Sequence, residues 1–344
     1  MCKGESKTIT LSYAGQNVEV AVGNVTFAND RQKASVSVVK QDDTTKNPLS
    51  GGIYGLYAAE DIADVSGNVV VRKDTLIEKA TTGTDGNAVY QADLPINHSY
   101  YVKELQAPVN YYRNSEDVFS FRFQYTNDKQ ASVAFTHTFE NERVNATIHL
   151  VKKDKETGRN TQGDAAFEGA VYGVYARENI IHPDGKTGIL YKAGSQVATM
   201  TVDKKGDASV VDLYLGKYYV KEAETAHGYV LDGEPRYVDL SYRDQDTPVV
   251  TYDEAWQNNR QKVKVTVLKK EKDTERVLAG GIFGLFTRED IKNASGDVLL
   301  EADTLIELKT TDENGQITFT ADLPVDGNYY VKELYAPDGF CDHQ

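Results

Sequence analysis

The sequence predicts an all-β protein made of repeated β-sandwich domains. Short segments alternate apolar and polar residues, turn sequences separate them, and almost no helical periodicity is present. The segment Tyr-Tyr-Val-Lys-Glu occurs three times, beginning at residues 100, 218 and 329. These copies lie a whole domain apart, too far for the short repeats of a solenoid, and 344 residues suffice for two or three domains.

Each unit begins with an alternating strand that carries one lysine on its apolar face. In the first unit Val36, Val38 and Lys40 share this face, because the side-chain period of a strand is two. Lys152 and Lys269 hold the same place in the second and third units. Such a lysine is either a charge at the solvated end of a strand or a buried amine that needs a partner.

A second, aromatic-rich strand follows in each unit, and its glycines mark a bulge or a close approach of the backbone. The three copies occupy residues 51–57, 169–175 and 280–286. Acidic stretches at residues 60–62 and 289–291 then predict a single turn of helix. A tight turn afterwards leads into another alternating strand in every unit.

The repeated Tyr-Tyr-Val-Lys-Glu strand places a carboxyl group on the core face. Tyr100, Val102 and Glu104 share one side of this strand, and Glu222 and Glu333 hold the place of Glu104 in the other copies. A buried carboxyl group without a partner costs several kcal/mol, so we expect each of the three to be paired.

A closing strand places an asparagine two residues after an aromatic residue. Asn141 follows Phe139, and Asn258 follows Trp256. The interval from the asparagine to the next facing lysine is 11 residues in both cases, which implies a short, stiff connection between units. Asn29 precedes Lys40 by the same interval.

The two ends of the chain are out of phase with the repeats. Residues 5–31 have the pattern of closing strands, with Asn29 as their asparagine, whereas the third unit stops soon after Glu333. We therefore expect four segments. They are 1–31, the last strands of a preceding incomplete domain; 32–143 and 144–260, two complete domains; and 261–344, a third domain truncated before its last strands.

The recurring lysine, glutamate and asparagine predict a covalent crosslink within each complete unit. Burial lowers the pKa of a lysine and raises that of a glutamate, and a neutral amine is a nucleophile. A protonated glutamate polarises the asparagine carbonyl and passes its proton to the departing ammonia. The predicted bonds are Lys40–Asn141 with Glu104, and Lys152–Asn258 with Glu222; the alternative is three unrelated polar residues at strand ends.

The predicted reaction occurs once per domain, so it matures the protein and is not enzymatic turnover. By analogy with a disulfide, closing a loop of about 100 residues stabilises a domain by roughly 4–5 kcal/mol. For the third unit, the catalytic Glu333 and the orphan Lys269 form an incomplete site, and Asn29 is an orphan partner.

Composition excludes several other classes of function. The net charge of −14 argues against nucleic acid and anionic membranes as partners, and no apolar run is long enough for membrane insertion. The six histidines are scattered and no Gly-x-Ser-x-Gly motif occurs, so we expect no metal, no cofactor and no hydrolytic enzyme. Cys2 and Cys341 are expected to be unrelated thiols, and a bond between them is the alternative.

The motifs resemble those of the Cna protein B-type (SpaA-like, prealbumin-like) domains of Gram-positive surface adhesins and pilins. The resemblance covers nearly all of the chain and rests on the strand ending in Lys40, on Glu-x-x-Ala-Pro at residues 104–108 and 333–337, and on Phe139 to Asn141 with Arg143. The second unit departs from it, with Ala-His at residues 226–227 in place of Ala-Pro.

This resemblance implies tandem Ig-like, prealbumin-like β-sandwiches in an elongated array, with autocatalytic Lys–Asn isopeptide bonds. It also implies an extracellular place at the cell wall or cell surface, with neighbouring domains of the same surface protein as partners. No secretion signal, sorting signal or pilin polymerisation motif is present in the sequence, so export and anchoring rest on analogy alone. Two interpretations remain: a cytosolic protein, or a piece of a longer exported protein. The repeats favour the second interpretation.

Two functions follow from this. The first is a structural stalk without a ligand. The alternative is a binding module of an adhesin that grips a host extracellular protein or glycan through its loops. Tyr111, Tyr112 and Tyr125 are candidates for such binding, although tyrosines of this kind more often pack in the sandwich.

The mismatched ends suggest self-association in addition. The tail of one molecule, with Asn29, would complete the Lys269 and Glu333 site of another by strand addition, and this head-to-tail contact would propagate. The alternative is an arbitrary fragment with frayed ends.

Overall fold

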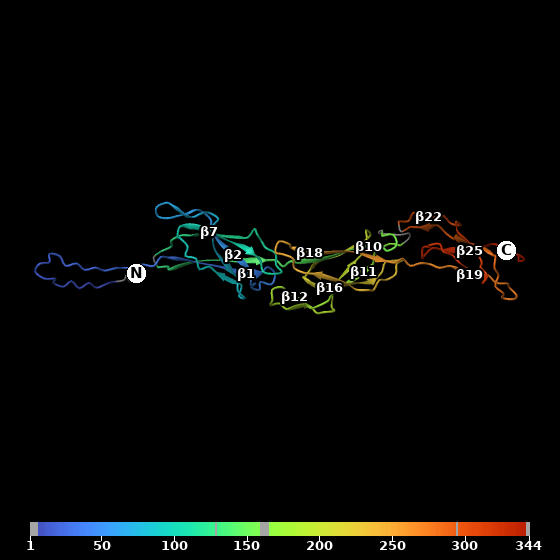
Figure 1. The fold of residues 1–344 in the computed structure, drawn as a ribbon, viewed down its shortest axis with the longest axis horizontal. Coiled ribbons are helices and arrows are strands. Elements are labelled where there is room, and N and C mark those ends of the chain that lie inside the picture. Colours follow the sequence, from blue (N-terminus) through green and yellow to red (C-terminus); the bar gives the residue numbers. More distant parts are fainter. Residues whose placement is uncertain (1–5, 128, 159–164, 294, 342–344) are drawn as a thin grey trace. The chain divides into compact units, whose positions relative to one another are not determined.

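The computed structural model describes residues 6–127, 129–158, 165–293 and 295–341. These ranges contain strands β1 to β25 and no helix, so the predicted all-β class is confirmed (Figure 1). Accordingly, nothing in the described ranges has the length and hydropathy of a membrane-spanning helix.

The first sandwich consists of two facing sheets and a short hairpin. One sheet has the strand order β6-β1-β9, the other β5-β2-β7-β8, and β3 pairs with β4. The strands are β1 (Lys33–Asp42), β2 (Ile53–Ala58), β3 (Ile62–Ala63), β4 (Val69–Val71), β5 (Leu76–Thr81), β6 (Asn87–Val89), β7 (His98–Gln106), β8 (Val118–Phe123) and β9 (Ser132–Asn141).

The second sandwich repeats this plan, with sheets β15-β10-β18 and β14-β11-β16-β17 and the pair β12-β13. The strands are β10 (Asn145–Asp154), β11 (Val171–Ala176), β12 (Ile180–Ile181), β13 (Ile189–Tyr191), β14 (Gln196–Thr201), β15 (Asp207–Leu213), β16 (Gly216–Glu224), β17 (Arg236–Leu240) and β18 (Val249–Asn258).

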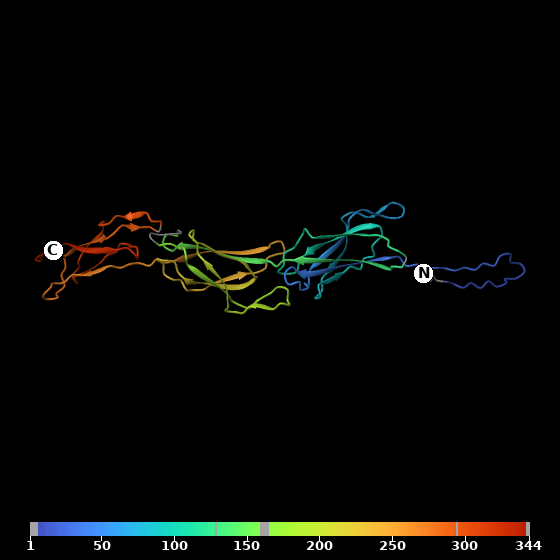
Figure 2. The same ribbon diagram turned by 180° about the vertical axis from the view of Figure 1, so that it is seen from behind.

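The third domain contains fewer strands in its described part, in sheets β19-β24 and β23-β20-β25 and the pair β21-β22. Figure 2 shows them from behind, in orange and red. The strands are β19 (Thr266–Leu268), β20 (Ile282–Thr287), β21 (Ile291–Lys292), β22 (Val298–Leu300), β23 (Leu305–Thr310), β24 (Gln316–Thr318) and β25 (Tyr329–Tyr335).

The first and last strands of each complete sandwich are parallel neighbours. Along the whole length of β1, each residue has a partner on β9, from Lys33 opposite Ser132 to Asp42 opposite Asn141. β10 and β18 pair in the same way, from Asn145 to Asp154. The chain therefore enters each sandwich at one end of this strand pair and leaves it at the other end.

The buried faces are the faces that alternation predicts. Val36, Val38 and Lys40 point into the first sandwich from β1, and Tyr100 and Val102 do so from β7. The remaining buried apolar residues of this core are Tyr54, Leu56, Ala58, Ile62, Ala88, Tyr90, Leu94, Phe121, Phe123 and Phe139.

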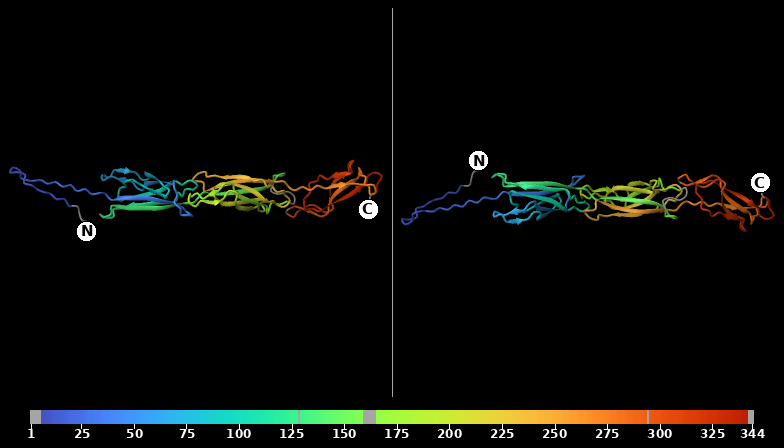
Figure 3. Two further views of the ribbon diagram at one scale, coloured as in Figure 1. Left: turned by 90° about the horizontal axis from the view of Figure 1, so that it is seen from below. Right: turned by 90° about the horizontal axis from the view of Figure 1, so that it is seen from above.

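One local prediction is wrong. The acidic stretches after β2 and β20 lead into the short strands β3 and β21 instead of a turn of helix, because each pairs with the strand that follows it. Residues 6–31 are the described part of the segment expected to provide the closing strands of a preceding domain, and this part contains no strand here. Its assignment to a preceding domain stays a prediction. These residues double back on themselves (dark blue in Figure 3), and Lys7 Nζ donates to the Thr26 carbonyl. A ladder requires a paired neighbouring strand, and no strand of the described part of the chain pairs with this segment.

Candidate functional site

The first sandwich brings Lys40, Glu104 and Asn141 together in its core. Lys40 and Asn141 come from the adjacent strands β1 and β9, and Glu104 comes from β7 in the facing sheet. Lys40 Nζ donates to Asn141 Oδ1 and lies 3.5 Å from Glu104 Oε1. Asn141 Nδ2 in turn donates to Glu104 Oε1 and Oε2, at 3.2 and 3.0 Å.

Burial sets the electrostatics of this group. The Lys40 and Glu104 side chains are 0% and 1% exposed. Burial lowers the pKa of Lys40 from 10.5 to about 8, and the attraction of Glu104 opposes part of this shift. Near neutral pH, a larger fraction of Lys40 than of a surface lysine is therefore in the neutral, nucleophilic amine form.

The second sandwich forms an equivalent group in which the glutamate bridges the other two residues. Lys152 on β10 pairs with Glu222 Oε1, while Asn258 on β18 donates from Nδ2 to Glu222 Oε2 at 2.6 Å. Asn258 Nδ2 also donates to the Val230 carbonyl at 2.9 Å. Burial lowers the pKa of Lys152, against the opposing pull of Glu222.

The third domain holds only part of such a group. Lys269 Nζ contacts Glu333 Oε2 at 2.7 Å, and each side chain is 21% exposed. Glu333 Oε1 is buried and has no hydrogen-bond partner within the described residues. Asn29 is exposed in the 6–31 segment.

The family model of the SpaA prealbumin-like fold domain matches residues 34–138, 138–255 and 263–344. The chain belongs to this family. It consists of three SpaA-type domains in tandem, and the resemblance inferred from the motifs is confirmed. A comparison with curated proteins found no match.

Solved structures are similar to this chain at low sequence identity, and one of them shares its fold. The Bacillus anthracis TIE protein has a TM-score of 0.59 and 21% identity, over 89% of this chain and 46% of that one, so the chain spans about half its length. A streptococcal ancillary pilin gives 0.28 and 19%, over 91% and 93%. BcpA, the major pilin subunit of Bacillus cereus, gives 0.34 and 13%, over 89% of each chain.

Sequence reasoning missed a tyrosine in each complete SpaA-type site. Tyr54 OH donates to Glu104 Oε1 at 2.9 Å, and Tyr172 OH donates to Glu222 Oε1 at 3.0 Å. Burial, with the nearby carboxylate, raises the pKa of both hydroxyls, so they remain donors. The third domain has Phe283 at this position. The Tyr-to-Phe difference was visible in the sequence, but the strand register that sets Tyr54 opposite Glu104 was not.

The contact between glutamate and asparagine also differs from the predicted one. Glu104 and Glu222 contact Nδ2 of their asparagines, and the carbonyl oxygen of Asn141 accepts from Lys40 Nζ. Asn258 Oδ1 has no hydrogen-bond partner in the described ranges. The glutamate therefore faces the nitrogen that leaves, which suits proton delivery, and it does not polarise the carbonyl in this arrangement.

The other candidate residues lie outside these sites. Tyr111 is buried, and its hydroxyl donates to Asp42 at 2.7 Å, so it is not available to an external ligand. Tyr112 is half-buried, and Tyr125 is 55% exposed.

Cys341 is an exposed free thiol, whereas Cys2 lies outside the described residues. No cluster of three metal-ligating side chains occurs among the described residues.

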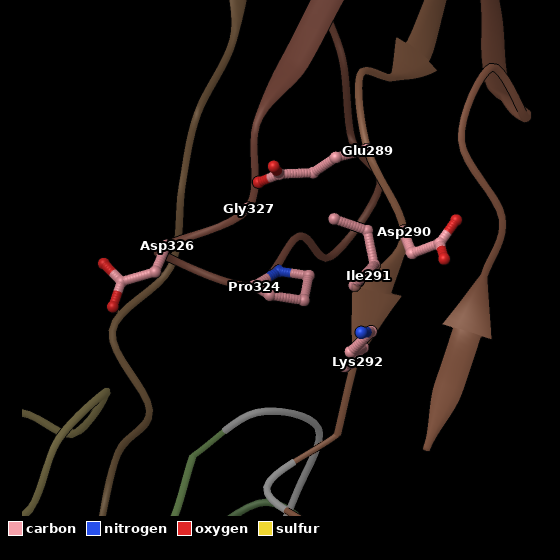
Figure 4. A pocket seen from close by; sticks show the side chains of 7 residues that line it. All are labelled: Glu289, Asp290, Ile291, Lys292, Pro324, Asp326 and Gly327. Carbon is pink, nitrogen blue, oxygen red and sulfur yellow. The ribbon is translucent and has the colours of Figure 1, made fainter. Parts of the chain in front are cut away.

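A small pocket in the third domain contains none of the predicted site residues. Its lining combines three carboxylates with one lysine, and Pro324 and Ile291 lie between them (Figure 4). The lining residues are Glu289, Asp290, Ile291, Lys292, Pro324, Asp326 and Gly327.

Proposed function

We propose that this chain is a run of stalk domains from a Gram-positive cell-surface pilin or adhesin, and that its first two domains crosslink themselves. The proposed isopeptide bonds are Lys40–Asn141 and Lys152–Asn258. The observation that carries the proposal is the buried contact group of Lys40, Glu104 and Asn141, in which the amine, the acid and the carboxamide all touch. The motif resemblance supports the place at the cell surface.

The reaction begins with proton transfer from the Lys40 ammonium to the Glu104 carboxylate, 3.5 Å away. The neutral amine then attacks Cγ of Asn141. Glu104 gives its proton to Nδ2 and recovers one from the attacking nitrogen, so the Cγ–Nδ2 bond breaks and ammonia leaves. The products are a Lys–Asn amide and one ammonia, and Glu104 passes the last proton to it as ammonium.

Folding supplies the acceleration, because it holds the reacting groups in contact. β1 and β9 are adjacent and in register, and the 1%-exposed Glu104 side chain reaches the pair from the facing sheet. Effective concentrations in well-aligned intramolecular reactions are very high. Each site acts once, so the proposed role is structural and has no catalytic turnover.

Intact mass under denaturing conditions tests the proposal. We expect the purified chain to weigh less than its sequence mass by two molecules of ammonia, one for each complete domain. Asn141→Ala is expected to restore one ammonia equivalent, because the Lys40 amine then has no carboxamide to attack. Asn114→Ala, at an exposed loop position, serves as the control and keeps the full deficit. An unmodified mass for the parent chain would show that no bond forms.

The pH dependence of stability provides an independent check on Lys40. In the Asn141→Ala chain the amine stays free, and its pKa is about 8 when folded and near 10.5 when unfolded. The unfolded state then binds more protons between these values, so the stability of the first domain rises as pH increases from about 8 to 10.5. The parent chain, whose Lys40 nitrogen is an amide, lacks this contribution. Denaturant titrations of both chains across this window measure the difference, and parallel profiles would argue against the bond.

A further inference from the structure

We propose that Tyr54 and Tyr172 are positioning residues of the crosslinking reaction. Each hydroxyl holds the glutamate carboxylate in the orientation that serves both the amine and the departing nitrogen. The inference rests on the crosslinking chemistry proposed above. It extends each reacting group from three residues to four, and it makes the rate of crosslinking depend on a side chain that the reaction leaves unchanged.

In the first domain, the Tyr54 hydroxyl is a donor to Glu104 that outlasts the reaction. Glu104 Oε1 accepts from Tyr54 OH at 2.9 Å and from Asn141 Nδ2 at 3.2 Å. Lys40 Nζ lies 3.5 Å from the same oxygen, and Oε2 accepts from Asn141 Nδ2 at 3.0 Å. Lys40 and Asn141 both change their bonds in the proposed reaction. Of the donors to Glu104 within the described ranges, Tyr54 is therefore the one that holds the carboxylate from start to finish.

The second domain assigns the two carboxylate oxygens of Glu222 to different groups. Oε1 accepts from Tyr172 OH at 3.0 Å and pairs with Lys152. Oε2 accepts from Asn258 Nδ2 at 2.6 Å and from the Asp232 backbone N–H at 2.8 Å. Each oxygen thus has one donor that does not react. Tyr172 OH also accepts from Lys152 Nζ at 2.5 Å, so this hydroxyl touches the amine and the acid at once.

Packing fixes the place of the Tyr54 hydroxyl. Tyr54 lies opposite Glu104 in the pairing of β2 with β7, and its side chain is fully buried. Its ring centroid is 4.7 Å from that of Phe139, which precedes Asn141 by two residues on β9. The ring is therefore held between the strand that carries the acid and the strand that carries the amide. A hydroxyl held in this way is preorganised, so little alignment is left to the moment of reaction.

The ring of Tyr172 is held by equivalent neighbours. Tyr172 lies opposite Glu222 in the pairing of β11 with β16, and its ring packs edge-on against Trp256 with the centroids 4.9 Å apart. Burial, with the nearby carboxylate, raises the pKa of this hydroxyl, so it keeps its proton and remains a donor. The recurrence of the arrangement in a second, independently packed core argues for a shared role.

The third domain shows that a ring without a hydroxyl fits this position. Phe283 lies opposite Glu333 in the same strand pairing, and it is buried in its core. A change of Tyr54 or Tyr172 to phenylalanine removes one oxygen atom and keeps the ring that fills the core. Such a change therefore tests the hydroxyl and not the fold.

The rate of ammonia loss from newly made chains tests the proposal. Full-length chains are made by cell-free translation, synthesis is stopped, and intact mass is followed over time, with digestion to assign each loss to a domain. We expect Tyr54→Phe to slow the loss in the first domain by about tenfold, the order that one hydrogen bond to a charged group contributes. Tyr172→Phe should slow the second domain by more, because its hydroxyl also contacts the amine. The unaltered domain of each variant provides the reference rate.

Two other buried tyrosines provide matched controls. The hydroxyl of Tyr100 donates to the Pro95 carbonyl at 2.7 Å, and that of Tyr218 donates to the Tyr214 carbonyl at 2.6 Å. Tyr100→Phe and Tyr218→Phe therefore remove the same atom from the same two cores, and both are expected to keep the parent rates. Protease resistance, measured in parallel, shows that each domain has folded.

Restoring a donor on the ring separates positioning from packing. Tyr54→para-aminophenylalanine, introduced by amber suppression in the same translation, places an N–H donor where the hydroxyl was, and we expect it to recover most of the parent rate. Phenylalanine variants that react as fast as the parent overturn the inference, as do equal slowing in the controls and a failure of the amine to restore the rate. If the parent chain loses two ammonia molecules in such a case, only this inference fails; if it loses none, the proposed function fails too.

Discussion

Replacing Asn141 by Ala is expected to lower the melting temperature of the first domain by about 20 °C. The proposed bond closes a loop between residues 101 positions apart, and opening a loop of this size costs roughly 4–5 kcal/mol on the chain-entropy account used for disulfides. For a domain of about 100 residues, each kcal/mol shifts the melting temperature by about 4 °C or more. Glu104 also loses the amide that contacts both of its oxygens, which adds to the effect.

Differential scanning calorimetry of the full chain measures this change, with the transition of the unaltered second domain as an internal reference. Asn114→Ala, at an exposed position, is the control and should shift the first transition by little. If Asn141→Ala moves the transition no further than Asn114→Ala does, the first domain carries no stabilising crosslink.

Replacing Glu222 by Ala is expected to prevent the second domain from folding stably. The change removes the acid that assists the reaction, and it leaves the buried Lys152 ammonium without its partner. Breaking a buried pair costs about 3–5 kcal/mol, and the missing crosslink costs roughly 4–5 kcal/mol more. Together these losses approach the whole stability of a typical domain, which is about 5–15 kcal/mol. Asp232 N, which donates to Glu222 Oε2 at 2.8 Å, loses its acceptor as well.

The Glu222→Gln variant separates the loss of the crosslink from the loss of the buried partner of Lys152. The amide retains an oxygen acceptor in the site but cannot shuttle a proton, so we expect a folded second domain without its ammonia deficit. Glu224→Ala, at the exposed end of β16, is the matched control and should change neither mass nor stability appreciably. Protease resistance of the second domain, followed together with intact mass, distinguishes the three variants. A Glu222→Ala chain with a normal transition and a normal deficit would contradict the assigned role.

Much of the fold and of the site could be predicted because the signals are local. The alternation of Val36, Val38 and Lys40 alone predicts which face is buried, and the same holds for Tyr100, Val102 and Glu104. Recurrence of the lysine, glutamate and asparagine in the same order then indicated that they meet, since burying them apart would be costly. The structure places them together in both complete domains.

The remaining features of the fold and of the site depend on pairing between distant segments, which the alternation of apolar and polar residues does not encode. Tyr54 reaches Glu104 only because β2 and β7 pair in one particular register. The orientation of the Asn141 carboxamide follows from which of its neighbours donate and which accept. Residues 6–31 have the pattern of strands, yet they form none, because a strand is completed by its neighbour and not by its own sequence.

The parallel pairing of β1 with β9 determines how a domain would carry tension. A pull on the chain reaches the first sandwich at Lys33 and leaves it after Asn141, at opposite ends of the strand pair. With Lys40 bonded to Asn141, the force runs along β1 as far as Lys40 and then crosses the side-chain amide bond to Asn141. Residues 41–140 therefore carry no tension. In such a crosslinked domain the hydrogen-bonded sheets position the reacting groups, and covalent bonds of the β1 backbone and of the crosslinked side chains resist extension.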